Sequence, residues 1–209
     1  NRTIHIIGLN IDGKNKLMAE KCKKLKEMRK ERAEKISLKL SKVGIEGAYE
    51  YTKKIAKNGN ITRYHFAQFL IEKKYARNLT DVFKRFLVKN KPGYVSTNWP
   101  NLDETINLIN IAGGVAVIAH PLRYKITATK LRKLIKEFKN CGGKAIEVIT
   151  SHNILKEVAI ASDYAKKYNL AASIGSDFHN EKTSWNKLGG LPLLPDNLLP
   201  VWKLWKDNN

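Results

Sequence analysis

Three short apolar runs, separated by segments of helix length, constrain the fold more than any other feature of the chain. The runs are VAVIA at 115–119, AIEVI at 145–149 and AASI at 171–174, and helical segments are expected between them at 128–140 and 154–168. Strands that alternate with helices predict parallel βαβ units. Continuous apolar runs are typical of strands that are covered on both faces. We therefore expect an α/β fold for this part of the chain.

The N-terminal half combines one more strand with a helical region. TIHIIGL at 3–9 is β-branched and apolar, and Asp12-Gly13-Lys14-Asn15 ends this strand. Residues 16–43 have apolar positions at three- and four-residue steps, which predicts one long helix that stops at Gly44. Further helices are expected over 47–57, over 62–74 with Thr62 as a candidate N-cap, over 80–89 beginning at Thr80, over 101–112, and near 197–206.

These elements predict a single α/β domain with a helical subdomain inserted into it. Residues 1–13 and 101–209 would form the α/β part, and residues 14–100 would form the insertion. The chain has no internal repeat and no low-complexity linker. We therefore expect the functional groups of the α/β part to lie where its strands end.

The charge balance favours anionic partners without selecting a function. Lys and Arg number 39 against 19 Asp and Glu, so the net charge is +20. Such a surplus suits nucleic acid or nucleotides, although lysines spread along helices also suit a solvated face. No apolar run approaches a spanning helix of roughly 18 residues, and two isolated cysteines, Cys22 and Cys141, favour a reducing compartment. We expect a cytoplasmic protein with no membrane partner.

Metal-type ligands follow the ends of the predicted strands. His120 comes directly after VAVIA, Asp177 and His179 follow AASIGS as Asp-x-His, and His5 lies inside the first strand. Strand alternation would point Asp177 and His179 the same way. Imidazole and carboxylate together suit divalent Mn, Fe or Zn. Each histidine also has a structural alternative, because a histidine in a strand is often a hydrogen-bonded core residue.

These segments resemble a known family of phosphoesterases. IHIIGLNID, VIAHPLRY and IGSDFH resemble three consecutive motifs of the polymerase-and-histidinol-phosphatase (PHP) family. Within it they resemble the branch of nucleoside-3′,5′-bisphosphate phosphatases that also act as 5′-to-3′ exoribonucleases. ITRYHFAQFL, Arg29-x-x-Arg32-Ala33, DVFKRFL and KPGYV resemble the helical insertion of that branch. The resemblance covers essentially the whole chain.

The resemblance implies a fold, an activity and a set of site residues. The fold would be part of a distorted (β/α)₇ barrel with metal ions at its strand ends, manganese first and iron or zinc as alternatives. The metal ligands would be His5, His120, Asp177 and His179. Arg123 would act on the substrate phosphate as a catalytic residue, and Arg63, His65, Arg29 and Arg32 would bind substrate from the insertion. The substrate would be a nucleoside bisphosphate or an RNA 5′ end.

One part of the family pattern is not found in this sequence. The family opens with His-x-His, an Asp, an Asp-His motif and a Gly-x-Glu ahead of the segment that IHIIGLNID resembles, and this opening is not in the given sequence. This predicts the C-terminal portion of a phosphoesterase, inactive alone, with its own N-terminal segment as a candidate partner. The alternative is a non-catalytic RNA- or nucleotide-binding protein on a degenerate PHP scaffold. Glu147 could be a further polar group near the site or a structural carboxylate.

Overall fold

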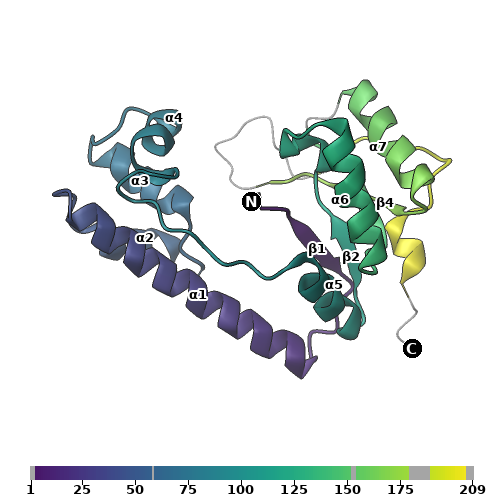
Figure 1. Cartoon of the computed structure of the whole chain (residues 1–209), viewed down its shortest axis with the longest axis horizontal. Coiled ribbons are helices and arrows are strands. Elements are labelled where there is room, and N and C mark those ends of the chain that lie inside the picture. Colours follow the sequence, from purple (N-terminus) through teal and green to yellow (C-terminus); the bar gives the residue numbers. More distant parts are fainter. Residues whose placement is uncertain (1–2, 58, 152–153, 179–188, 206–209) are drawn as a thin grey trace. The chain divides into compact units, whose positions relative to one another are not determined.

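The computed structural model describes residues 3–57, 59–151, 154–178 and 189–205 of the chain. The chain divides into two compact units (Figure 1). The first combines Asn1–Met18 with Trp99–Asn209, and the second is Ala19–Asn98. Each unit has its own hydrophobic core, so each is described by itself.

The first unit is built on a four-stranded sheet with the order β1-β2-β3-β4. Its strands are β1 (Ile6–Leu9), β2 (Val115–Ile118), β3 (Ala145–Thr150) and β4 (Ala171–Gly175). β2, β3 and β4 run parallel, as the alternation of strands and helices predicts, whereas β1 pairs with β2 in the antiparallel direction. The described strands therefore form a mixed sheet with β1 and β4 at its edges.

Helices cover one face of this sheet. α5 (Leu102–Ile111), α6 (Ala128–Asn140) and α7 (Leu155–Lys167) share one core cluster with alternate side chains of the strands. The opposite face packs Val115, Val117 and Ala145 against Val201 of the short 3₁₀ helix η3 (Val201–Leu204). Neighbouring residues of β2 thus enter different cores, because successive side chains of a strand point to opposite faces. This layering explains the continuous apolar runs.

The second unit is a small bundle of helices. It contains most of α1 (Lys16–Ser41), followed by α2 (Ala48–Ala56), α3 (Arg63–Glu72), α4 (Leu79–Val82) and the π-helical turn η1 (Phe83–Leu87). Its core contains large side chains that are fully buried, namely Ile36, Leu40, Phe66, Phe69, Leu70 and Leu87. α1 ends at Ser41, and Gly44 then adopts φ +79°, a left-handed conformation that glycine tolerates without strain.

Four sequence-based expectations need correction. β1 begins at Ile6, so His5 precedes the strand and does not lie inside it. Asn78 caps α4, because its side chain accepts from the Asp81 backbone N–H at 3.0 Å; Thr80 is already the second helical residue. The predicted helix 80–89 is interrupted by the π-helical turn. Of the predicted helix 197–206, the described residues form only the 3₁₀ helix η3.

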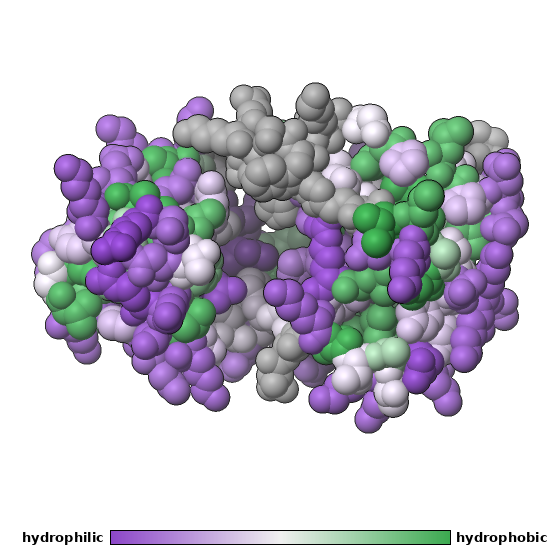
Figure 2. All heavy atoms as spheres, turned by 90° about the horizontal axis from the view of Figure 1, so that it is seen from above, coloured by the Kyte–Doolittle hydropathy of each residue, from purple (hydrophilic) through white to green (hydrophobic). Residues whose placement is uncertain are grey.

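Hydrophilic side chains dominate the face of both units that Figure 2 shows, in keeping with the net charge of +20. Hydrophobic atoms appear there as separate patches. No helix in the described part of the chain combines the length and the apolar character that crossing a bilayer requires.

Candidate functional site

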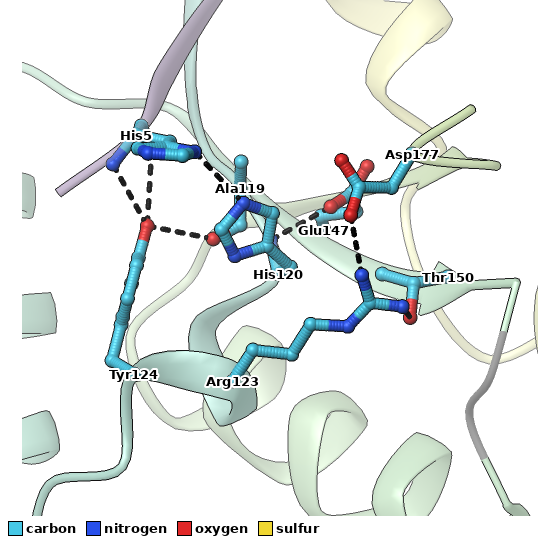
Figure 3. A network of polar contacts seen from close by, with 8 residues as sticks. All are labelled: His5, Ala119, His120, Arg123, Tyr124, Glu147, Thr150 and Asp177. Atoms are coloured by element: carbon cyan, nitrogen blue, oxygen red, sulfur yellow. Dashed lines mark hydrogen bonds and ion pairs between the residues drawn. The ribbon is translucent and has the colours of Figure 1, made fainter. Parts of the chain in front are cut away.

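One edge of the sheet in the first unit collects the polar side chains. β2, β3 and β4 are parallel, so their carboxyl ends share this edge, and antiparallel β1 begins there. His5 directly precedes β1, His120 follows β2, and Asp177 follows β4. Glu147 extends from β3, and Thr150 ends that strand. Figure 3 shows these side chains pointing toward one another.

His5 and His120 are in direct contact. His120 Nε2 lies 3.1 Å from His5 Nδ1, and the two rings meet edge to face with their centroids 4.9 Å apart. His120 has a left-handed backbone with φ 30° and ψ 55°. Such a conformation costs a non-glycine residue on the order of 1–3 kcal/mol and is typical of functional sites. The residue that follows, Pro121, opens the 3₁₀ helix η2 (Pro121–Tyr124).

Glu147 supports the strained backbone of His120. The backbone N–H of His120 donates to Glu147 Oε2 at 2.7 Å, and Glu147 is only 5% exposed. Burial raises the pKa of Glu147 to about 7, although the hydrogen bond from His120 opposes this shift. A Cβ on Gly175 would lie 2.3 Å from Glu147 Oε1, so only glycine leaves room for the carboxylate there. The Glu147 carboxylate is therefore held in a fixed place beside His120.

The His120 imidazole is prepared to accept a ligand. Burial first, and then the adjacent His5, lowers the pKa of His120, while the charge of Asp177 opposes the shift. His120 is therefore neutral near pH 7, the form in which imidazole binds metals. Its Nδ1 atom is buried and has no hydrogen-bond partner among the residues that the structure describes. An unsatisfied buried nitrogen is costly, and a bound ion or water would remove that cost.

Arg123 joins the ends of two strands. Its Nη1 forms an ion pair with the Asp177 carboxylate, and its Nη2 donates to Thr150 Oγ1 at 3.2 Å (Figure 3). A cavity of about 100 Å³ lies beside it, with His120, Glu147 and Thr150 among its lining residues. Asp177 also has a left-handed backbone, with φ 52°. A guanidinium group that lines a small cavity suits recognition of an anion.

The chemistry of these side chains suits a divalent metal ion, but the described residues do not complete a ligand set. Two imidazoles and two carboxylates are the donors that Mn, Fe and Zn accept. No group of three His, Cys, Asp or Glu side chains within the described ranges is arranged to hold an ion. His179, the fourth predicted ligand, lies outside those ranges. The facing ring nitrogens of the two histidines, His120 Nε2 and His5 Nδ1, are the feature that fits a metal.

The four predicted substrate-binding residues of the insertion all belong to the second unit. Burial, and then the charges of Arg63 and Arg29, lowers the pKa of Arg32. The Arg32 Nε atom is buried without a hydrogen-bond partner in the described part of the chain. Arg63 also stacks over the Phe83 ring at 5.9 Å. Three guanidinium groups thus share one region of this unit, an arrangement that favours an anion between them.

His65 has a structural role in the same unit. Its Nδ1 accepts the backbone N–H of Thr62 at 3.1 Å, at the start of α3. Burial lowers the pKa of His65, so the ring is neutral near pH 7. The Nδ1 atom is therefore occupied as a helix cap, and any contact with a ligand falls to the other ring nitrogen.

The sequence predicted which edge of the sheet carries the site, but it did not predict all of the side chains that form the site. The strand-alternation argument for Asp177 and His179 was wrong in its geometry, because β4 ends at Gly175 and Asp177 has a left-handed backbone. Tyr124 and Thr150, which hydrogen-bond within the site, were not predicted. The motif VIAHPLRY contains Tyr124, but its apolar neighbours gave no sign that its hydroxyl is used.

Proteins with known names resemble this chain along nearly its whole length. It is 40% identical over 206 residues to the 5′-3′ exoribonuclease Rnm of Escherichia coli, covering 99% of this chain and 70% of that protein. It is 36% identical over 202 residues to a 3′,5′-nucleoside bisphosphate phosphatase of Chromobacterium violaceum, covering 96% and 71%. A search with models of protein families finds no match.

Solved structures agree with these relatives. An amidohydrolase from Chromobacterium violaceum, solved with bound sulfate and no metal, is 35% identical with a TM-score of 0.85. The match covers 97% of this chain and 71% of the other. A candidate metal-dependent phosphoesterase from Bifidobacterium adolescentis shares the fold at 21% identity, with a TM-score of 0.72, over 95% of this chain and 68% of the other.

Proposed function

Since the chain belongs to the PHP phosphoesterase branch that contains the 5′-3′ exoribonucleases and the 3′,5′-nucleoside bisphosphate phosphatases, we propose that it hydrolyses phosphate esters with a divalent metal. The substrates are nucleoside 3′,5′-bisphosphates, RNA 5′ ends, or both. The observation that carries this proposal is the convergence of His5, His120, Arg123 and Asp177 on one edge of the sheet. We also propose that this sheet is part of a distorted (β/α)₇ barrel.

The proposed metal ligands are His5, His120, Asp177 and His179. When bound there, a divalent ion, with manganese the first candidate and iron or zinc the alternatives, neutralises phosphoryl charge and lowers the pKa of a bound water toward ~7. The 3.1 Å contact between His120 Nε2 and His5 Nδ1 supports this assignment, because both nitrogens can face one ion. Glu147 and Gly175 hold the His120 backbone, which keeps the imidazole directed at the edge.

Arg123 is proposed to bind the phosphate that is removed. Its guanidinium already bridges Asp177 and Thr150, so its planar donor groups are held at the ends of two strands. Two parallel N–H donors match two non-bridging phosphate oxygens and add positive charge where negative charge builds up.

Arg29, Arg32, Arg63 and His65 of the helical unit are proposed to bind the rest of the substrate. The mutual effect of the three arginines on the pKa of Arg32 supports their grouping. A nucleoside bisphosphate carries a second phosphate, and RNA carries one at each step of its backbone. Contacts with such phosphates give affinity with little sequence preference.

The test is release of phosphate from adenosine 3′,5′-bisphosphate by the protein produced from its complete reading frame. We expect turnover with Mn²⁺ and its loss after EDTA treatment. Arg123→Ala should lower turnover by roughly 100-fold or more, as loss of a group that stabilises transition-state charge does. Arg132→Ala, on the exposed face of α6, is the matched control and should leave turnover unchanged.

The outcome that overturns the proposal is binding without hydrolysis. If the protein binds the bisphosphate or 5′-phosphorylated RNA yet releases no product with Mn²⁺, Fe²⁺ or Zn²⁺, it is a non-catalytic binding protein on the same scaffold. Equal losses for Arg123→Ala and Arg132→Ala would separately remove Arg123 from the mechanism.

A further inference from the structure

The Tyr124 hydroxyl ties together the two backbone segments that carry the paired histidines. Tyr124 ends η2 and is 7% exposed. Its oxygen accepts the backbone N–H of His5 at 3.0 Å. Its proton is directed to the carbonyl of Ala119 at 2.9 Å, with the carbonyl of His5 at 3.3 Å as a second acceptor (Figure 3). One hydroxyl thus contacts both His5 and Ala119, which are 114 positions apart in the sequence.

The ring of Tyr124 contacts the second imidazole. It meets the His120 ring edge to face, with centroids 5.4 Å apart. His5 comes before the first register pair of the two strands, Ile6 with Ile118, and Ala119 N–H donates to the His5 carbonyl at 3.1 Å. Beyond these strands, the Tyr124 hydroxyl therefore supplies two of the contacts that fix His5. Its ring limits the rotation of His120 from the other side.

This geometry offers more than satisfaction of buried backbone groups. A tyrosine hydroxyl keeps its proton near pH 7, so it can donate and accept together. The same side chain sets the backbone of one histidine and the ring of the other, whose nitrogens lie 3.1 Å apart. Neighbouring groups that orient ligand histidines typically determine metal affinity within a factor of about 10–100.

We propose that Tyr124 is a positioning residue that orients the His5–His120 pair toward one divalent cation. The proposal rests on the proposed function in one respect, namely that these histidines bind a metal. It goes beyond that function by assigning the alignment of the pair to a single side chain of η2. Tyr124 itself contacts neither substrate nor metal.

The first experiment compares Tyr124→Phe with Tyr168→Phe in the protein from its complete reading frame. Each variant loses one tyrosine hydroxyl, and Tyr168 packs against the same core. Mn²⁺ affinity is measured by competition with a chelator, and thermal stability is measured alongside. We expect Tyr124→Phe to weaken Mn²⁺ binding about 10- to 100-fold and Tyr168→Phe to leave it unchanged. An unchanged Mn²⁺ affinity in folded Tyr124→Phe would overturn the proposal.

A second measurement uses metal-free protein, so it separates this proposal from the proposed function. In the NMR spectrum of the wild type, we expect Tyr124 ring protons to show cross-peaks to the His120 ring. The ring signals of His5 and His120 should shift together in Tyr124→Phe and stay in place in Tyr168→Phe. Absence of the Tyr124–His120 cross-peaks would refute the proposal even if the variant failed to fold. Wild-type protein that shows them but binds no Mn²⁺ would refute the metal site, and with it the cation named in the proposal, while the alignment of the two histidines by Tyr124 would stand.

Discussion

Replacing Gly175 with alanine should displace the carboxylate that holds His120. The added Cβ would lie 2.3 Å from Glu147 Oε1 and 3.5 Å from Glu147 Cδ, and the first distance is far inside van der Waals contact. Gly175 does not have a left-handed backbone, so alanine itself is not strained there. The carboxylate must therefore move, and we expect this to break the 2.7 Å hydrogen bond that its other oxygen, Oε2, accepts from the His120 backbone N–H.

The expected change in the free energy of unfolding follows from the loss of that one hydrogen bond. A hydrogen bond to a charged group contributes about 1.5–3 kcal/mol, and replacing glycine with alanine returns roughly 0.4–1 kcal/mol by restricting the unfolded chain. We expect Gly175→Ala to lower the free energy of unfolding by about 1–2 kcal/mol. Urea unfolding of metal-free protein at pH 8, where Glu147 is mostly ionised, measures this change.

Gly13→Ala is the matched control, because nothing lies within 4 Å of the position its Cβ would take. It should be neutral or slightly stabilising. Combining Gly175→Ala with Glu147→Ala removes the clash, so the two changes should not be additive. The reasoning is refuted if Gly175→Ala unfolds at the same urea concentration as Gly13→Ala, or if the double variant loses the sum of the single effects.

Two further predictions concern the helical unit. The Arg77 backbone N–H first, and then Arg85, holds the pKa of Asp81 below its usual range, so this carboxylate stabilises the native state above about pH 4 and less as pH falls. Between pH 5 and pH 3, the free energy of unfolding measured with urea should fall less for Asp81→Asn than for the wild type. An equal fall in both proteins would contradict this. Leu70→Ala, at a fully buried position, should cost about 2–5 kcal/mol in the same assay, whereas Leu38→Ala, at a position 59% exposed, should be nearly neutral; similar costs would contradict the assigned core.

Most helices and strands could be predicted because local spacing sets them. The apolar runs gave β2, β3 and β4 within one or two residues, and α6 runs over Ala128–Asn140 as predicted. The failures occurred where a tertiary contact decided the outcome. β1 keeps only Ile6–Leu9, since the described pairing begins at Ile6 with Ile118. The π-helical turn Phe83–Leu87 buries Phe86 and Leu87 in a core that sequence spacing does not show.

The sequence predicted the position of the site at the carboxyl ends of the strands, but it did not predict the contacts between the side chains of the site. His120 and Asp177 could be located because functional groups follow the carboxyl ends of parallel strands. The contact between His5 and His120 depends on the antiparallel direction of β1, which the residue pattern does not give. The role of Glu147, left open from the sequence, depends on Gly175, 28 positions away, leaving room for its carboxylate.

Anomalous diffraction from Mn²⁺ in crystals of the protein tests most directly whether this edge of the sheet is a metal centre for phosphate chemistry. We predict an anomalous peak about 2 Å from a ring nitrogen of His5 and of His120, with an Asp177 oxygen at a similar distance. The two imidazole nitrogens, now 3.1 Å apart, would then both face the ion. Strong Mn²⁺ peaks elsewhere, with the His5–His120 contact unchanged, would contradict the assignment.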